Sequence, residues 1–152
     1  MGFNESTRAM LQQMGIGLRV DRAAAALVNA ETAIFYVKGG AVLMTGFFGK
    51  ITVASGANAT HLTHVPTTGT SIPIAANLDI DPALVGDYLT ITGVGTDAMK
   101  YNASTTGLCM MAYKGIVLSI GSFCYHSAAA DGSASWSMFY LPLEDGSYVE
   151  AV

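Results

Sequence analysis

Short apolar runs separated by turn-forming residues recur along most of the chain. The stretch 33–55 holds two such runs, which lie on either side of Gly39-Gly40. Adjacent glycines adopt the positive φ angles of a tight turn without strain, so this pattern predicts a β-hairpin. Gly46 and Gly49 interrupt the second run. Isolated glycines within a strand pattern predict a bulge or a sharp bend at that point.

Similar short runs continue to the end of the sequence, with Gly, Thr and Asn between them. Pro73 predicts that its strand lies at a sheet edge or begins there, because proline donates no hydrogen bond to a neighbouring strand. We expect 136–142 to pair with 34–48, so that strands from the two ends of the β region meet. The pattern predicts one all-β domain, a β-sandwich or a β-barrel. The further predicted strands are 60–65, 71–78, 88–93, 108–113, 115–120, 122–127 and 135–141.

The first 32 residues have a different pattern. Ser6–Met14 is predicted to form a short helix with Ser6 as its N-cap, and the Ala-rich stretch 21–30 is predicted to add another helical turn or two. Short isolated helices are only marginally stable in water, so we expect this segment to dock on something. The chain therefore divides into an N-terminal arm at 1–32 and a β domain at 33–152. The arm docks either on its own domain or on a neighbouring subunit.

Composition indicates that much of the surface meets other protein. Hydrophobic residues make up 51% of the chain and charged residues only 12%, whereas soluble domains carry about 25% charged residues. A membrane-spanning helix needs roughly 20 consecutive apolar residues. The most apolar stretch, 115–130, is broken by Gly121 and His126. We therefore expect subunit contacts rather than membrane insertion.

The distribution of charge argues against a nucleic-acid partner. The net charge is −4, and the seven basic residues are scattered, with none between Ile51 and Met99. Proteins that bind nucleic acids present clustered Lys and Arg to the phosphates. The N-terminus also lacks the basic start and apolar stretch of a secretory signal, so we expect synthesis in the cytosol.

Few residues offer metal or catalytic chemistry. His61 and His64 are three apart, and on a strand this odd spacing places them on opposite faces. Asp79, Asp81 and Asp87 carry oxygen ligands, but their spacing does not fit a calcium loop, and Asp79 and Asp81 are expected to begin or cap a turn. We predict no metal site and no cofactor.

The remaining motifs do not indicate an enzyme. Gly93-Val-Gly95 lacks the third glycine of a phosphate-binding loop, and no Gly-X-Ser-X-Gly nucleophile motif occurs. We therefore predict no catalytic residues. Cys109 and Cys124 lie in apolar runs, where buried free thiols are the default; a disulfide is possible if their strands are adjacent.

Aromatic residues gather in the predicted strands. Alternation places Trp136 and Met138 on one face of the last long strand, and Ser137 and Phe139 on the other. Core packing with a subunit seam explains such a set, and a carbohydrate-binding platform is the functional alternative. The aromatic residues concerned are Phe47, Phe48, Phe123, Tyr125, Trp136, Phe139 and Tyr140.

Several of these motifs resemble a group of small proteins of tailed bacteriophages that are generally found with capsid genes. The motifs are Ile34-Phe-Tyr-Val before Gly39-Gly40, Pro66-Thr-Thr-Gly-Thr, and the closing Trp136-Ser-Met-Phe-Tyr-Leu-Pro-Leu-Glu-Asp-Gly. The resemblance covers about 120 residues by order and spacing. Its motifs are structural rather than chemical. At 147–152 the chain departs from the pattern, because small residues are more usual there.

The resemblance implies a capsid decoration, or cement, protein. Such a protein would be made in the cytoplasm of the host bacterium and would bind the outer surface of the virion. Its partner would be the major capsid protein, and it would form a homotrimer that stabilises contacts between capsid subunits. The alternative is a tail, baseplate or head-fibre component that binds a host glycan through exposed aromatic residues, for which Trp136 and Tyr140 are the candidates.

Overall fold

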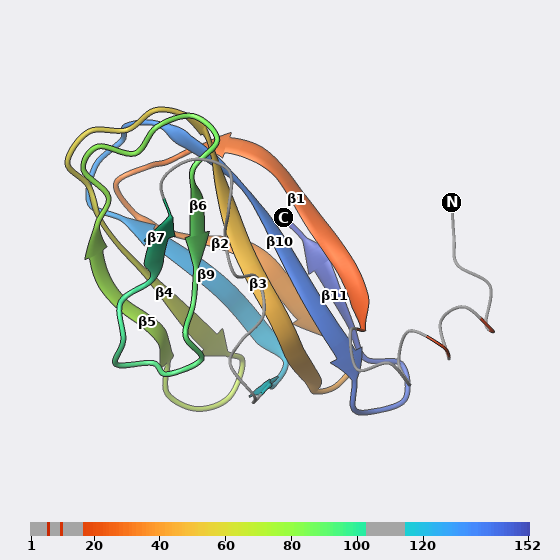
Figure 1. Cartoon of the computed structure of the whole chain (residues 1–152). Helices are drawn as coiled ribbons and strands as arrows, with labels where there is room; N and C mark the ends of the chain where they lie inside the picture. Colours follow the sequence, from red (N-terminus) through yellow and green to blue (C-terminus); the bar gives the residue numbers. More distant parts are fainter. Residues whose placement is uncertain (1–5, 7–9, 11–16, 103–114) are drawn as a thin grey trace.

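The computed structural model describes Ser6, Met10 and residues 17–102 and 115–152. Residues 17–102 and 115–152 fold into a sandwich of β-strands (Figure 1). The predicted all-β domain is therefore confirmed. The described strands are β1 (Leu18–Ala26), β2 (Glu31–Lys38), β3 (Val42–Val53), β4 (Ala59–Pro66), β5 (Ile72–Asp79), β6 (Tyr88–Thr90), β7 (Lys100–Asn102), β8 (Ile116–Leu118), β9 (Gly121–Ser127), β10 (Ser133–Pro142) and β11 (Tyr148–Ala151).

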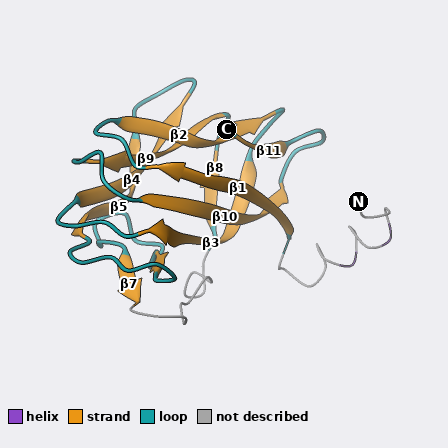
Figure 2. Cartoon of the chain, turned by 90° about the horizontal axis from the view of Figure 1, so that it is seen from above, coloured by secondary structure: helices purple, strands orange, loops and turns teal. Residues whose placement is uncertain are grey.

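Two antiparallel sheets form the layers of the sandwich, as Figure 2 shows from above. Sheet A has the order β1-β10-β3-β6-β7, and β8 also pairs with β3. Sheet B has the order β11-β2-β9-β4-β5. Among the described strands the sheets remain separate rather than closing into a barrel, so the sandwich is the correct one of the two predicted architectures. Pro73 lies in β5, at an edge of sheet B, as predicted.

Gly39 and Gly40 do not form the predicted hairpin. The strands on either side of them lie in different sheets: β2 pairs with β9 and β11, whereas β3 pairs with β10, β6 and β8. The glycines therefore carry the chain from one layer to the other. Gly39 has a φ of 75°, and a Cβ there would lie 2.2 Å from the carbonyl oxygen of Gly146. Apolar runs beside a Gly-Gly pair predict two strands, but they do not indicate whether those strands share a sheet.

The expected pairing between the last long strand and the region before residue 48 is confirmed for β3. Residues Ser137 to Pro142 of β10 pair with Phe48 to Val42 of β3. The register shifts between Phe139 and Tyr140, opposite Gly46 and Met44, which confirms the predicted irregularity near Gly46. The other half of the expectation fails, because β2 pairs with β9 and β11 instead.

Part of the predicted N-terminal arm belongs to the sandwich. Residues 18–26 form β1, which pairs antiparallel with β10 from Leu18↔Tyr140 to Ala26↔Ser133. The helix predicted over 21–30 is therefore wrong. Ala-rich sequences favour helix intrinsically, but pairing with β10 and packing of Leu18 and Val20 on the core override that preference. Apart from Ser6 and Met10, the helix predicted over Ser6–Met14 lies outside the described residues.

Aromatic side chains fill the space between the sheets. Trp136 of β10 lies 5.5 Å from Phe47 and 4.9 Å from Tyr125 between ring centroids, and Phe47 lies 5.1 Å from Phe123. The close approach requires Gly49 opposite Trp136, because a Cβ there would lie 2.3 Å from the indole ring. The predicted core role of these aromatic residues is confirmed.

Candidate functional site

The outer face of sheet A carries a groove of about 680 Å³. Strands β1, β3, β6 and β10 contribute its walls and floor, because alternate side chains of each strand point away from the core. We call this surface the cation–aromatic groove. Its main lining residues are Arg19, Asp21, Arg22, Phe48, Lys50, Tyr88 and Ser137.

Strand register brings these residues together from distant parts of the sequence. Asp21 of β1 lies opposite Ser137 of β10, and Ser137 lies opposite Phe48 of β3. One row along, Lys50 of β3 lies opposite Tyr88 of β6. Cross-strand neighbours of this kind have Cβ atoms about 4.5–5.5 Å apart, so the rows form a continuous surface.

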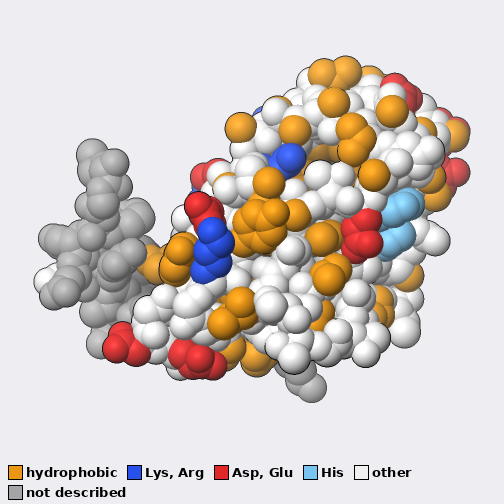
Figure 3. Space-filling view, turned by 180° about the vertical axis from the view of Figure 1, so that it is seen from behind, with side chains coloured by type: hydrophobic (Ala, Val, Ile, Leu, Met, Phe, Trp, Pro, Cys, Tyr) orange, Lys and Arg blue, Asp and Glu red, His pale blue; other side chains and the backbone are white. Residues whose placement is uncertain are grey.

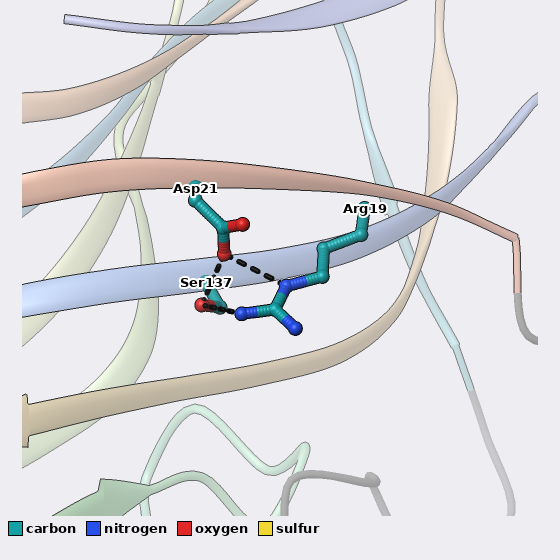
Figure 4. Close-up of polar contacts among 3 residues, drawn as sticks. All are labelled: Arg19, Asp21 and Ser137. Atoms are coloured by element: carbon teal, nitrogen blue, oxygen red, sulfur yellow. Dashed lines mark hydrogen bonds and ion pairs between the residues drawn. The ribbon is translucent and has the colours of Figure 1, made fainter. Parts of the chain in front are cut away.

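Arg19 is held over the floor of the groove by contacts on three sides (Figure 4). Its Nε donates to Asp21 Oδ1 at 2.8 Å, and its terminal nitrogen donates to Ser137 Oγ at 3.4 Å. Ser137 Oγ in turn donates to Asp21 Oδ1 at 2.5 Å. The guanidinium carbon lies 5.9 Å and 5.8 Å from the ring centroids of Phe48 and Phe139. These contacts fix the guanidinium over the aromatic rings and leave part of it facing solvent.

Lys50 forms the second positive point of the groove. Its Nζ lies 6.0 Å from the centroid of the Tyr88 ring, and that ring meets Phe48 edge-on at 5.8 Å. No ion pair joins Lys50 to a carboxylate within the described part of the chain. The ammonium group is exposed and available to an external carboxylate.

Arg22 lies on the other face of β1, because it is opposite Trp136 of β10. Its side chain is partly buried, its Nε has no hydrogen-bond partner among the described residues, and burial lowers its pKa. The groove thus brings together two cations, Arg19 and Lys50, and one carboxylate, Asp21, in a chain whose net charge is −4. This local excess of positive charge favours an acidic occupant.

The outer face of sheet B has a different chemistry. His61 of β4 and His126 of β9 lie directly opposite each other, with their rings stacked at 4.4 Å and 14°. His61 Nδ1 is hydrogen-bonded to Asn77 Oδ1 at 2.9 Å, and Thr63 donates to Glu31. Figure 3 shows this face, where histidine side chains lie beside an acidic side chain. His61, Asn77, Thr63 and Glu31 are thus hydrogen-bonded within the sheet, whereas His126 Nδ1 has no hydrogen-bond partner among the described residues.

The two predicted histidines lie on opposite faces of β4, as the spacing predicted. His61 faces outward, whereas His64 points into the core and is 1% exposed. Burial lowers the pKa of His64, whose Nε2 lies 3.4 Å from Ser119 Oγ. The described residues contain no group of three His, Cys, Asp or Glu side chains placed to hold a metal ion.

The predicted aspartates hold turns in place. Asp79 accepts a hydrogen bond from the backbone of Asn58 at 3.0 Å. Asp87 is 1% exposed and accepts bonds from the backbone of Leu84, at 2.7 Å, and from the hydroxyl of Tyr101. Asp81 is exposed in the turn between β5 and β6.

Gly93 and Gly95, which lack the third glycine of a phosphate-binding loop, lie between β6 and β7. Gly95 packs closely on another part of the backbone, since a Cβ there would lie 2.2 Å from the carbonyl oxygen of Pro73. This close approach gives Gly95 a structural role.

Trp136 and Tyr140 are not available as a glycan platform. They are 2% and 6% exposed, and both point into the core. On β10 it is Phe139, on the opposite face, that reaches the surface beside Arg19. The proposed pair of glycan-binding residues is therefore wrong, because alternation along β10 assigns both to the inner face.

Cys124 is a free thiol that is 6% exposed on β9. Burial, with a smaller contribution from Glu31, raises its pKa to about 11, so the thiol stays protonated at neutral pH. This agrees with the buried free thiol that the apolar run predicted for Cys124, and Cys109 lies outside the described residues.

The groove was not found from the sequence. Arg19 and Lys50 were seen only as scattered basic residues, because 31 positions separate them along the chain. The available signal was local: Arg19 and Asp21 are two residues apart, as are Phe48 and Lys50, so both members of each pair face outward from their strand. Only the strand order reveals that these pairs are neighbours.

Comparison with known protein families, with curated proteins and with solved structures gave no match. Within the described residues, no helix is both long enough and apolar enough to cross a membrane.

Proposed function

We propose that this protein is a structural subunit of a bacteriophage virion, which binds the outer surface of the capsid as a homotrimer and stabilises contacts between major capsid subunits. The motif resemblance from Ile34 to Gly146 leads to this class of protein. The observation that carries the proposal is the cation–aromatic groove on the outer face of sheet A.

The composition of the groove supports a protein partner. Buried interfaces are enriched in Tyr, Phe and Arg, and the strongest contributions to binding often come from Tyr and Arg. Here Arg19 lies over Phe48 and Phe139, and Lys50 lies beside Tyr88. Aromatic faces that bind sugars need to be open for stacking, whereas Arg19 covers two of these rings. This arrangement favours a protein surface over a glycan.

The low charge of the chain supports the same class. Only 12% of the residues are charged, and large apolar side chains remain exposed around the sandwich. Apolar surface beyond what one subunit buries is typical of proteins that assemble. The more exposed of these side chains are Val53, Ile72, Leu84, Val85, Val94, Val117, Leu143 and Val152, each at least 50% exposed.

Copy number tests the proposal. Quantitative mass spectrometry of purified virions should find this protein in hundreds of copies per particle, because a decoration protein repeats with the symmetry of the shell. A handful of copies would contradict the capsid role and favour a tail, baseplate or fibre component.

A truncation tests the predicted arm. Removal of residues 1–16 leaves β1 intact, because that strand begins at Leu18. We expect weaker attachment to capsids and an unchanged midpoint of thermal unfolding. Removal of residues 1–20 is the matched control: it deletes part of β1, so the midpoint should fall as well. Unchanged attachment of the 1–16 deletion would show that the arm does not bind the capsid.

A further inference from the structure

We propose that the cation–aromatic groove of one subunit binds the loop at residues 143–146 of a second copy of the same chain. This head-to-tail contact, repeated three times, would close the homotrimer. The inference rests on the trimeric state in the proposed function, and it identifies the two surfaces that form the trimer.

The loop at 143–146 has a suitable composition for this groove. It connects β10 to β11, and all four residues, Leu143, Glu144, Asp145 and Gly146, are exposed, with Leu143 at 50%. One large apolar side chain therefore stands next to two carboxylates. In the described part of the chain, neither carboxylate forms an ion pair.

The loop is also held in a defined shape. The Ser147 hydroxyl donates to the carbonyl oxygen of Glu144 at 2.8 Å, and the Ser147 backbone N–H donates to the same oxygen at 3.1 Å. Gly146 has a φ of 80°, which completes the tight turn. A loop ordered before binding loses little conformational entropy when it docks.

Charge and apolarity match between the two surfaces. The groove has an excess of cations, with Lys50 unpaired, and its floor is formed by the rings of Phe48 and Tyr88. The carboxylates of Glu144 and Asp145 would face the cations, and Leu143 would pack against the rings. Opposite potentials of this kind fix the register of a contact and exclude wrong partners.

The positions of the two surfaces determine the type of contact. The groove lies on the face of sheet A, whereas the loop lies at the end of the sandwich where the chain passes from β10 to β11. Because the two surfaces differ, the contact is heterologous, and such contacts form closed rings when the rotation between copies closes. Any closed ring leaves no groove and no loop unoccupied, and the number three is taken from the proposed function.

Sedimentation equilibrium on the full chain tests the contact. The unchanged protein should have three times the 15.8 kDa mass of one chain. Lys50→Glu places a carboxylate in the groove, and the double substitution E144K/D145K reverses the charge of the loop. We expect each to weaken association by about 30-fold or more, because loss of an interfacial charge pair typically costs 2 kcal/mol or more. The matched control is Glu31→Lys, a charge reversal on sheet B at the end of β2 that is remote from the loop, which should leave the mass unchanged.

Combining the changes shows whether the two surfaces meet. If they do, K50E/E144K/D145K should associate more tightly than the product of the separate losses predicts, since the reversed charges again attract. Losses that simply multiply would overturn the contact. So would a monomeric unchanged protein, or trimers that survive Lys50→Glu. Circular dichroism of each variant confirms that the sandwich is folded.

The outcomes separate this inference from the proposed function. A chain that is monomeric in solution yet is present in hundreds of copies on virions would refute the trimer contact and leave the capsid role intact. Lower capsid binding by a monomeric Lys50→Glu variant would then assign the groove to the capsid instead. Trimers formed through this contact, with only a handful of copies per virion, would refute the capsid role and leave the contact intact.

Discussion

The two outer faces of the sandwich differ in how far their polar groups are already satisfied. On sheet B, His61 stacks on His126 and is hydrogen-bonded to Asn77, and Thr63 donates to Glu31, although His126 Nδ1 has no hydrogen-bond partner among the described residues. On sheet A, Lys50 lies beside an aromatic ring and forms no ion pair within the described part of the chain. A face whose groups are mostly paired gains little from a new contact, whereas an unpaired cation beside aromatic rings gains both charge pairing and apolar burial. Sheet A is therefore the face that we expect to bind.

The largest expected effect on stability distinguishes a residue on the inner face of β10 from a residue on its outer face. Trp136→Ala should lower the free energy of unfolding by about 3–5 kcal/mol, because it leaves a cavity against Phe47 and Tyr125. Phe139→Ala, three residues along β10 on the outer face, should lower it by less than about 1.5 kcal/mol. Urea denaturation measures both. Equal losses would mean that the two sides of β10 are not distinct.

A second prediction concerns the effect of the buried His64 on how stability depends on pH. Burial lowers the pKa of His64, so the unfolded chain binds a proton more readily than the folded one. The stability that His64 contributes through this difference is therefore fully present above the unfolded pKa of about 6.5. It is lost as the pH falls through the lower, folded pKa. Thermal unfolding between pH 7 and pH 5 should show this loss of stability. His64→Gln should reduce the slope, and an unchanged slope would exclude His64 as its source.

A smaller effect on stability is expected when Arg19 in the groove is substituted. Arg19→Ala removes the stacking on Phe48 and Phe139, and the substitution should lower the free energy of unfolding by about 0.5–1 kcal/mol. Arg19→Lys keeps the charge but loses the planar contact and should recover only part of the loss. Chemical denaturation measures both variants. A lysine variant as stable as the unchanged protein would show that charge alone matters at this position.

The smallest effect is expected on sheet B. Lys38 and Glu150 form an exposed ion pair, and the hydrogen bond that Lys38 Nζ donates to Glu150 raises the pKa of Lys38. Exposed pairs contribute little because water and salt screen them. Lys38→Gln should therefore leave both the unfolding midpoint and the association state unchanged. A clear loss of association would mean that sheet B also takes part in assembly.

The sequence predicted the parts of this fold that depend on local pattern. Alternation along 135–141 assigned Trp136 and Phe139 to opposite faces, and the spacing of His61 and His64 did the same for β4. The sequence-based predictions failed where the sheet that a strand joins depends on strands far away in the sequence. Gly39-Gly40 was interpreted as a hairpin although its strands lie in different layers. The stretch 21–30 was interpreted as helical although β10 holds most of it as a strand.

The groove could not be predicted for the same reason. Its residues come from four strands, and their adjacency depends on the order β1-β10-β3-β6. Within any one strand, Phe48 or Lys50 is an ordinary surface residue of a sheet. The signal lies in the register that brings Phe48 beside Ser137 and Lys50 beside Tyr88, which a single sequence does not encode in any local pattern.

Hydroxyl-radical footprinting tests most directly whether sheet A is the binding face. The labelling of Tyr88 and Phe139 on sheet A is compared with that of Tyr36 and His61 on sheet B, in the assembled protein and in the Lys50→Glu variant. Assembly should protect the sheet A residues severalfold and leave Tyr36 and His61 equally reactive. Protection confined to Tyr36 and His61, with sheet A unchanged, would contradict the account.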